Sequence, residues 1–201
     1  MGHHARMADP PAVPRLFTER LLLRGFRDED RGPFAALNAD PAVAEFFVTT
    51  LDRGQSDALV DRIHERWRVD GFGLFAIERR QDGRLLGFVG AMMLPWAPDP
   101  YPEIGWRLAR EGWGQGYATE AAREAMRFAF DDVGSDALVS YTTVTNVRSR
   151  RVMEKLGMAR LDDTAPYDFL HPGVPEGHPL RPHVAYRLTR ADWQARRAAA
   201  D

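Results

Sequence analysis

The amino-acid sequence predicts a single α/β domain in which helices cover both faces of one mixed β-sheet. Its 201 residues slightly exceed the usual size of one domain, and 44% of them are apolar, enough for one sizeable core. The expected strands first come in a hairpin-like run and then alternate with helices, which is typical of a sheet covered by helices. The sequence contains no internal repeat and no linker that would divide two cores.

Composition excludes several classes of function. A formal net charge of −2 gives no electrostatic reason to expect a nucleic-acid partner, and the absence of cysteine excludes disulfides, thiolate zinc sites and a cysteine nucleophile. No apolar run approaches the roughly 18 residues needed to cross a bilayer, and the N-terminus lacks a secretory signal. We therefore expect a cytoplasmic protein with no membrane partner. Residues 1–15 are expected to be disordered or cloning-derived, 16–193 to form the domain and 194–201 to be a tail.

The N-terminal segment is expected to start with a strand and continue with helices. The apolar run within Glu19–Phe26 predicts a largely buried strand. Asp28–Asp30 supply acidic side chains that suit a helix N-terminus, and Phe34 begins the apolar positions of that helix. Pro41 is expected to restart a short helical piece that ends near Phe47.

A second helix and a hairpin follow. Ser56 is a good N-cap and apolar residues recur every four positions after it, which predicts a helix over Ser56–Val69. Leu74–Glu78 and Arg84–Leu94 are expected to be the two strands of a hairpin, because Asp82 and Gly83 between them form a strong tight-turn signal. Pro95–Pro102 contains too many prolines for a helix or a strand and is expected to be a loop.

The C-terminal half is expected to alternate strands and helices. A second irregular segment is expected over His171–Pro182, where prolines and glycines gather. The expected strands are Glu103–Leu108, Ala137–Thr143 and Val184–Leu188, and the expected helices are Tyr117–Phe130, Val147–Leu156 and Ala191–Ala199.

The most informative stretch is Trp113–Ala121, where a strand is followed by two glycines and then at once by a helix. Glycines let the backbone N–H groups approach a ligand, and the first N–H groups of a helix lie at the positive end of its dipole. Together these features favour a phosphate site, while a tight turn without a ligand is the alternative. The stretch matches neither the P-loop nor the dinucleotide fingerprint. A stripe of small residues would hold this helix close to the sheet: Ala118, Ala121, Ala122, Ala125 and Ala129.

Together with Glu103–Leu108, this stretch resembles the acetyl-CoA signature of the GNAT N-acetyltransferases. The chain is most similar to the branch that contains ribosomal-protein N-terminal acetyltransferases (RimJ/RimL-like). Asn146–Met158 matches the same branch at the expected spacing, as does Thr18–Arg24. The resemblance extends over roughly residues 16–193, nearly the whole chain.

The resemblance implies a mostly antiparallel central sheet that is split between the strands Glu103–Leu108 and Ala137–Thr143. Acetyl-CoA would be the co-substrate, with its pantetheine arm in the split and its diphosphate on the backbone of Gly114–Thr119. Trp113 replaces the Arg or Gln of the general superfamily motif, so Arg151 is a candidate for the missing charge. The residues implied to bind acetyl-CoA are Trp106, Arg107, Leu108, Trp113, Gly114, Gln115, Gly116, Tyr117, Ala118, Thr119, Asn146, Ser149 and Arg151.

The resemblance also implies direct attack of an amine on the thioester, without a covalent enzyme intermediate. A backbone N–H near Arg107 or Leu108 would face the oxyanion. Glu103 is the candidate base, with a solvated strand-end carboxylate as the alternative. Ser149, or a tyrosine further along the chain, would protonate the departing thiolate, although Ser149 could instead be an ordinary first-turn serine. Asn146 would hydrogen-bond the pantetheine arm, cap its helix, or do both.

The acceptor is not specified by the sequence. A protein N-terminal α-amine and a small-molecule amine are both compatible, and the two proline-rich loops, with Trp96 and Tyr101 in the first of them, are expected to shape the pocket. An antibiotic-modifying acetyltransferase, a non-catalytic acyl-CoA sensor and a purely structural domain are alternatives, and a homodimer is one expectation from the resemblance. The histidines at 171, 178 and 183 match no metal-ligand spacing, so no metal is expected.

Overall fold

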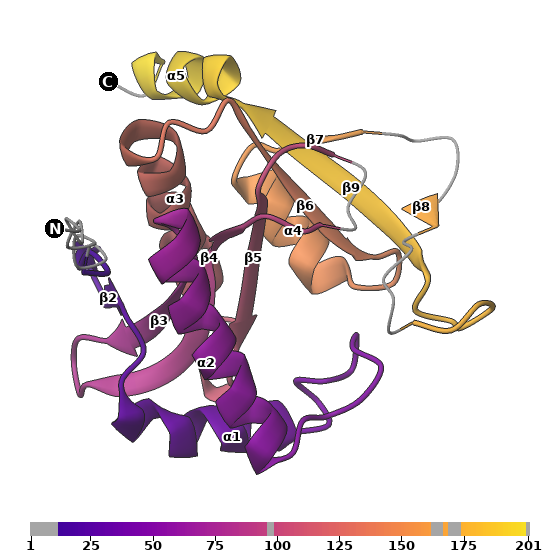
Figure 1. The fold of residues 1–201 in the computed structure, drawn as a ribbon. Helices are drawn as coiled ribbons and strands as arrows, with labels where there is room; N and C mark the ends of the chain where they lie inside the picture. Colours follow the sequence, from indigo (N-terminus) through magenta and orange to yellow (C-terminus); the bar gives the residue numbers. More distant parts are fainter. Residues whose placement is uncertain (1–11, 96–98, 162–166, 169–173, 200–201) are drawn as a thin grey trace, which may run out of the picture.

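The structure is a computed structural model, and it describes residues 12–95, 99–161, 167–168 and 174–199. Within these residues the chain forms a nine-stranded mixed sheet with helices on both faces, as the sequence predicts (Figure 1). The strand order is β1-β2-β3-β4-β5-β6-β9-β7, and β8 pairs with β9 beside this path. No helix of the described part is both long and apolar enough to span a membrane.

The strands and helices follow the expected order with a few shifted bounds. The strands are β1 (Leu16–Phe17), β2 (Leu21–Arg24), β3 (Leu74–Arg79), β4 (Arg84–Met92), β5 (Glu103–Leu108), β6 (Ala137–Thr143), β7 (Ala159–Arg160), β8 (Tyr167–Asp168) and β9 (Pro182–Thr189). The α-helices are α1 (Arg31–Ala39), α2 (Arg53–Asp70), α3 (Tyr117–Arg127), α4 (Val147–Lys155) and α5 (Arg190–Ala198). A π-helical turn, Phe128–Asp132, extends α3.

The sheet is split between β5 and β6, which confirms the expectation. These two strands run parallel, and the one register pair between them is Glu103 with Val139. On its other edge β5 pairs fully with β4, and the N–H of Ala109 donates to the carbonyl of Leu86 at 2.8 Å. Hydrogen-bond directions alternate along an antiparallel strand, so the backbone groups of Trp106 and Leu108 face the split.

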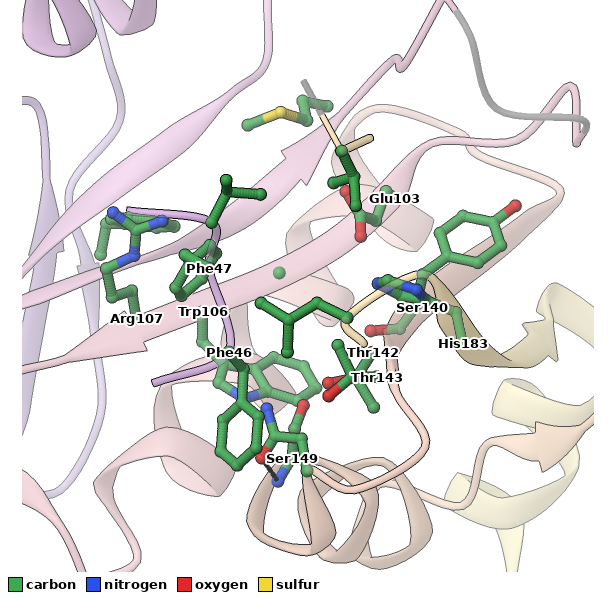
Figure 2. Close-up of a pocket in the computed structure, with 18 of the residues that line it drawn as sticks. Phe46, Phe47, Glu103, Trp106, Arg107, Ser140, Thr142, Thr143, Ser149 and His183 are labelled. Atoms are coloured by element: carbon green, nitrogen blue, oxygen red, sulfur yellow. Dashed lines mark hydrogen bonds between the residues drawn. The ribbon is translucent and has the colours of Figure 1, made fainter. Parts of the chain in front are cut away.

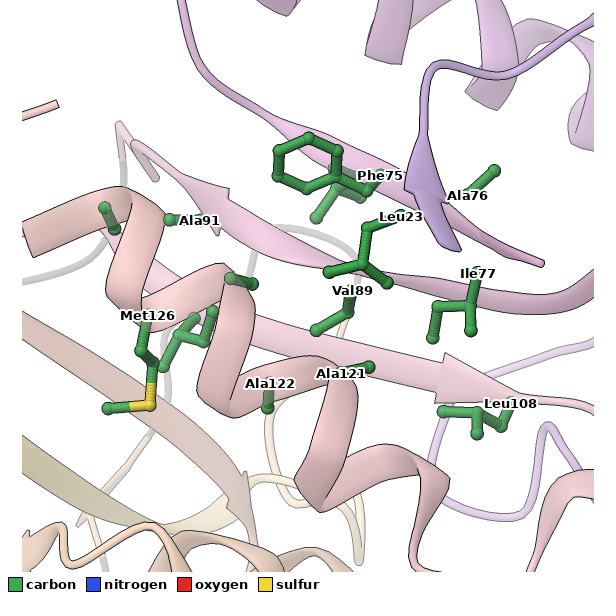
Figure 3. Packing of buried hydrophobic residues seen from close by; sticks show 14 of the residues in the cluster. Leu23, Phe75, Ala76, Ile77, Val89, Ala91, Leu108, Ala121, Ala122 and Met126 are labelled. Carbon is green, nitrogen blue, oxygen red and sulfur yellow. The ribbon is translucent and has the colours of Figure 1, made fainter. Parts of the chain in front are cut away.

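Helix α3 packs its stripe of small residues against one face of the sheet. Ala121 and Ala122 are fully buried, and Figure 3 shows them on the helix next to the strands that carry Val89 and Leu23. Because these side chains are small, the helix axis lies close to the strands and the loop before the helix is held in place.

Helix α2 begins earlier than expected. Asp52, not Ser56, is the N-cap: its side chain accepts from the N–H of Gln55 at 2.8 Å, and the Gln55 side chain accepts from the N–H of Asp52 at 2.9 Å. This reciprocal capping box makes the helix begin about one turn before Ser56. Ser56 is instead buried inside the helix, where its hydroxyl accepts from Asn38 at 2.9 Å.

Three smaller expectations were also wrong. Pro41 does not restart a helix: residues 41–46 form turns, with the N–H of Phe47 bonded to the carbonyl of Ala44 at 2.8 Å. The strand expected over Glu19–Phe26 is shorter, as β2 (Leu21–Arg24), and the short strand β1 precedes it; β4 ends at Met92, two residues earlier than expected. The two-residue strands β7 and β8 were not expected, because such short pairings leave no periodic signal.

Candidate active site

Two adjoining cavities open at the split in the sheet. The first, which we call the β5 cavity, has a volume of about 530 Å³ and is lined by Glu103, Gly105 and Arg107 together with residues 46–49 and 51 (Figure 2). The second, the α3 cavity, has a volume of about 370 Å³. It is lined by the loop with Gly114 and Gly116 that precedes α3, which we call the glycine loop, and by one side of α4. The residues that line both cavities are Phe46, Phe47, Trp106, Arg107, Asn146 and Ser149.

Glu103 opens β5 and borders the β5 cavity. Glu103 is half-buried, and its side chain lies at the edge of this cavity. Burial raises the pKa of Glu103 to about 7, and a hydrogen bond from the backbone of Tyr141 opposes this rise. A carboxyl group with this pKa exchanges a proton near neutral pH, which is what a general base requires.

Arg107 projects into the β5 cavity from the far end of the same strand. Its guanidinium lies over the ring of Phe47 at 3.9 Å and donates to the side-chain oxygen of Asn38 at 2.7 Å. Burial lowers the pKa of Arg107 to about 10. The sequence motif indicated only the backbone of Arg107. Its side-chain environment was missed because Asn38 and Phe47 are distant in the chain and no local pattern links them to β5.

The glycine loop presents backbone N–H groups to the α3 cavity. Gly114 and Gly116 have φ values of +70° and +81°, which side-chain-bearing residues rarely adopt. Gly116 caps α3 without a side chain, so the first N–H groups of the helix are not covered by its own cap. Arg148, Arg151 and Lys155 of α4 also line this cavity, along with Ala118 and Thr119. Backbone donors and three cations together fit a phosphate-bearing ligand.

Trp113 fixes this loop to the end of β5. Its indole N–H donates to the carbonyl of Leu108 at 2.8 Å, and the guanidinium of Arg148 stacks on its ring at 4.3 Å. An aromatic residue here therefore positions the loop, while charge is supplied from α4. Arg151, the candidate for that charge, lines the α3 cavity next to Arg148.

Two residues of the loop, Gln115 and Tyr117, are held by Arg20 of the connection before β2. Arg20 donates to the carbonyl of Gln115 at 2.9 Å, and its guanidinium lies 4.6 Å from the ring centre of the buried Tyr117. Arg20 also forms an ion pair with Glu120 at 2.6 Å. Tyr117 and Gln115 can thus offer backbone groups to a ligand, while the role of Arg20 was missed by the sequence reading.

Helix α4 begins at the mouth of both cavities. The side chain of Asn146 accepts from the N–H of Ser149 at 3.1 Å, so Asn146 caps the helix. Ser149 is half-buried and lines both cavities, which brings its hydroxyl to the boundary between them.

The described residues contain no group of three His, Asp or Glu side chains that could hold a metal ion. His183 lines the β5 cavity and its Nδ1 is 2.8 Å from the carbonyl of Arg181, whereas Nδ1 of His178 accepts from Leu180 in a local turn. His171 and Trp96 lie outside the described residues. Tyr101 packs beside the buried strand residues Val139 and Tyr141.

Comparison with known proteins identifies the family. The model of the Acetyltransferase (GNAT) domain matches residues 20–159. The FsC-acetyl coenzyme A-N(2)-transacetylase of Aspergillus fumigatus is 30% identical over 90% of this chain and 79% of its own length. The uncharacterised protein YkkB of Bacillus subtilis is 31% identical over 73% of this chain and 86% of its own.

Solved structures agree with this assignment. An acetyltransferase from Agrobacterium tumefaciens superimposes with a TM-score of 0.71 at 27% identity, over 88% of this chain and 95% of its own. A spermidine N-acetyltransferase from Vibrio cholerae, solved with CoA and spermine, has the same fold with a TM-score of 0.68 at 16% identity, over 88% of this chain and 99% of its own. The chain therefore belongs to the GNAT acetyltransferase family and is an acetyl-CoA-dependent acyltransferase.

Proposed function

We propose that the protein transfers an acetyl group from acetyl-CoA to a primary amine by direct attack in a ternary complex, with Glu103 as the general base. The observation that carries this proposal is the carboxyl group of Glu103 in the β5 cavity, with its pKa raised to about 7. Such a group is partly ionised at neutral pH and can take a proton from an ammonium or from the attacking amine.

Each residue has a defined part in this proposal. The backbone of the loop Gly114–Thr119 and the cations of α4 bind the diphosphate, and the backbone of Trp106 and Leu108 binds the pantetheine arm. Acetyl-CoA supplies the thioester carbon, to which the amine nitrogen forms its new bond as the bond to sulfur breaks. Glu103 takes the proton that the nitrogen loses. Ser149, at the boundary of the two cavities, donates its hydroxyl proton to the departing thiolate and is reprotonated from solvent.

The variant Ser149→Ala is expected to lower kcat by about tenfold. This is less than the usual contribution of acid–base groups, because a thiolate with a pKa of about 8.5 leaves readily even without a proton donor. Stability should hardly change, since the cap of α4 uses the backbone N–H of Ser149 and the side chain of Asn146. Unchanged turnover would remove the acid role of Ser149. Asn146→Ala is the matched control for loss of the cap itself, which should cost about 1 kcal/mol of stability.

The acceptor we favour has one amino group, which is either a protein N-terminal α-amine or the amine of a small molecule. An α-amine, with a pKa of about 8, is closer to its reactive neutral form than a lysine amine. The RimJ/RimL-like branch is part of this proposal, supported by the sequence motifs and by a fold shared with a ribosomal-protein-serine acetyltransferase from Vibrio cholerae at 19% identity. The Aspergillus relative is named for transfer at an N(2) position, which also supports an amine acceptor. Pairing as a homodimer rests on the family resemblance.

A polycationic acceptor such as an aminoglycoside is not favoured. Among the described residues that line the β5 cavity, Glu103 is the only carboxylate, and Arg107 adds a positive charge. A polycation would need several carboxylates to balance its desolvation.

The proposal is tested by following thiol release from acetyl-CoA in the presence of N-terminal peptides and small amines. We expect release that depends on the amine and yields the N-acetyl product. Tight acetyl-CoA binding without release for any acceptor would contradict the proposal and favour a non-catalytic sensor. Absence of acetyl-CoA binding would contradict the cofactor site as well.

A further inference from the structure

The positive charge of Arg107 has no counter-ion within the described residues. Its Nη1 donates to the neutral side chain of Asn38, and its Nε is buried without a hydrogen-bond partner. Asn38 is 2% exposed and in turn donates to the buried hydroxyl of Ser56 at 2.9 Å, so it has a fixed orientation. A half-buried cation that is held only by neutral groups favours the binding of an anion beside it.

The placement of Arg107 connects this site to Glu103. Side chains alternate along a strand, so Glu103, Gly105 and Arg107 of β5 share one face, and all three line the β5 cavity. Gly105 lies between the two charged residues, and a Cβ at its position would meet nothing within 4 Å. The cavity is therefore open above Gly105, and Glu103 and Arg107 are separated by roughly 13 Å along the strand. Figure 2 shows the two charged side chains at opposite sides of the cavity with Phe47 between them.

We propose that Arg107 binds a carboxylate of the acceptor, so that the substrate is an elongated amino acid or peptide-like molecule with its amine at Glu103 and its carboxylate at Arg107. This rests on the proposed function, because it takes the β5 cavity as the place where the amine binds. The rings of Phe47 and Phe88 lie beside the group, with their centres 3.9 and 5.5 Å from the guanidinium carbon.

Phosphates, polyamines and amides fit the position beside Arg107 less well than a carboxylate does. Phosphates of the co-substrate have their own partners in the α3 cavity, where Arg148, Arg151 and Lys155 gather. A polyamine would place a second positive charge beside Arg107 without a carboxylate to balance it. A carboxylate accepts two parallel hydrogen bonds from a guanidinium, and an amide of the same shape cannot offer the charge.

The test compares ω-amino acids of increasing chain length with their primary amides, at saturating acetyl-CoA. We expect the wild-type kcat/KM to be about 10–100-fold higher for the best acid than for its amide, the range of a charge-assisted hydrogen bond. In Arg107→Gln the value for the acid should fall by the same factor, while the value for the amide changes by less than about threefold. Arg107→Lys should retain part of the preference, and it serves as the second variant if Arg107→Gln does not fold. Arg66→Gln, an exposed arginine on α2, is the matched control.

A binding experiment separates this proposal from the proposed function. Hexanoate and hexanamide, which carry no amine, are titrated into the wild type and Arg107→Gln and followed calorimetrically. Binding of hexanoate that is lost in the variant supports the carboxylate site even if no amine is acetylated. Equal rates for acids and amides in the wild type, an equal loss of both in Arg107→Gln, or no preference for hexanoate over hexanamide would overturn it.

Discussion

Replacing Glu103 by glutamine is expected to lower kcat by about 10²–10⁴-fold, the usual contribution of a general base. Glutamine keeps the size of the side chain and its place on β5, but its amide cannot accept the proton from the amine. Because Glu103 borders only the β5 cavity, the Kd for acetyl-CoA should change by less than about threefold. Steady-state kinetics and a separate acetyl-CoA titration measure the two quantities.

The matched control is Glu111→Gln, a carboxylate with an exposed ion pair to Arg84 that lines neither cavity. It should retain full turnover, since an exposed pair contributes little and no reacting group is near. Full turnover in Glu103→Gln would leave Glu103 as an ordinary carboxylate at a strand end. The base would then have to be sought among the other residues that line the cavity, where His183 carries an imidazole and Tyr141 a phenol.

The largest effect on stability is expected for Gly87→Ala in β4. Gly87 has a φ of +143°, and a Cβ there would lie 2.0 Å from the carbonyl oxygen of Arg107 and 2.9 Å from Cα of Leu108. Both contacts are to backbone of β5, which cannot yield as a flexible side chain would. We expect a loss of about 2–6 kcal/mol from backbone strain and overpacking, a large part of the 5–15 kcal/mol typical of a domain.

Gly83→Ala separates the two causes. Gly83, in the turn before β4, has a φ of +72° and no atom within 4 Å of an added Cβ, so strain alone should cost about 1–2 kcal/mol. Urea unfolding of the two variants gives the comparison. A similar loss of unfolding free energy in the two variants would show that β4 has room for a Cβ at Gly87 next to β5, the strand that carries Glu103 and Arg107.

The parts of the fold that the sequence predicts are those with a local signal. Tyr117–Arg127 has its stripe of alanines after a glycine pair, and Asp82 with Gly83 marks the hairpin of β3 and β4. Asn146 was predicted from the sequence both as a motif residue and as the cap of its helix, and it caps α4. In each case the residues that decide the structure lie within a few positions of one another.

The parts that could not be predicted depend on residues far apart in the chain or on competition between neighbours. Asp52 and Ser56 are both good caps, and the reciprocal bond with Gln55 decides between them. The sequence around Gly87 does not indicate that a side chain is excluded there, because the excluding atoms belong to the backbone of β5. The guanidinium of Arg107 contacts Asn38 and Phe47, which lie about sixty to seventy residues earlier in the chain, so its surroundings are known only from the folded protein.

The most direct test of the account is the pH dependence of kcat/KM for the amine at saturating acetyl-CoA. Glu103 accepts a proton only when ionised, and burial raises its pKa to about 7, so the rate should rise with pH and level off above that value. Measuring two amines of different pKa distinguishes this rise from the ionisation of the substrate, because only the latter shifts with the amine. The rise near pH 7 should be absent in Glu103→Gln. A rate governed only by the pKa of each amine, with no common rise near pH 7, would contradict the role of Glu103 in acetyl transfer.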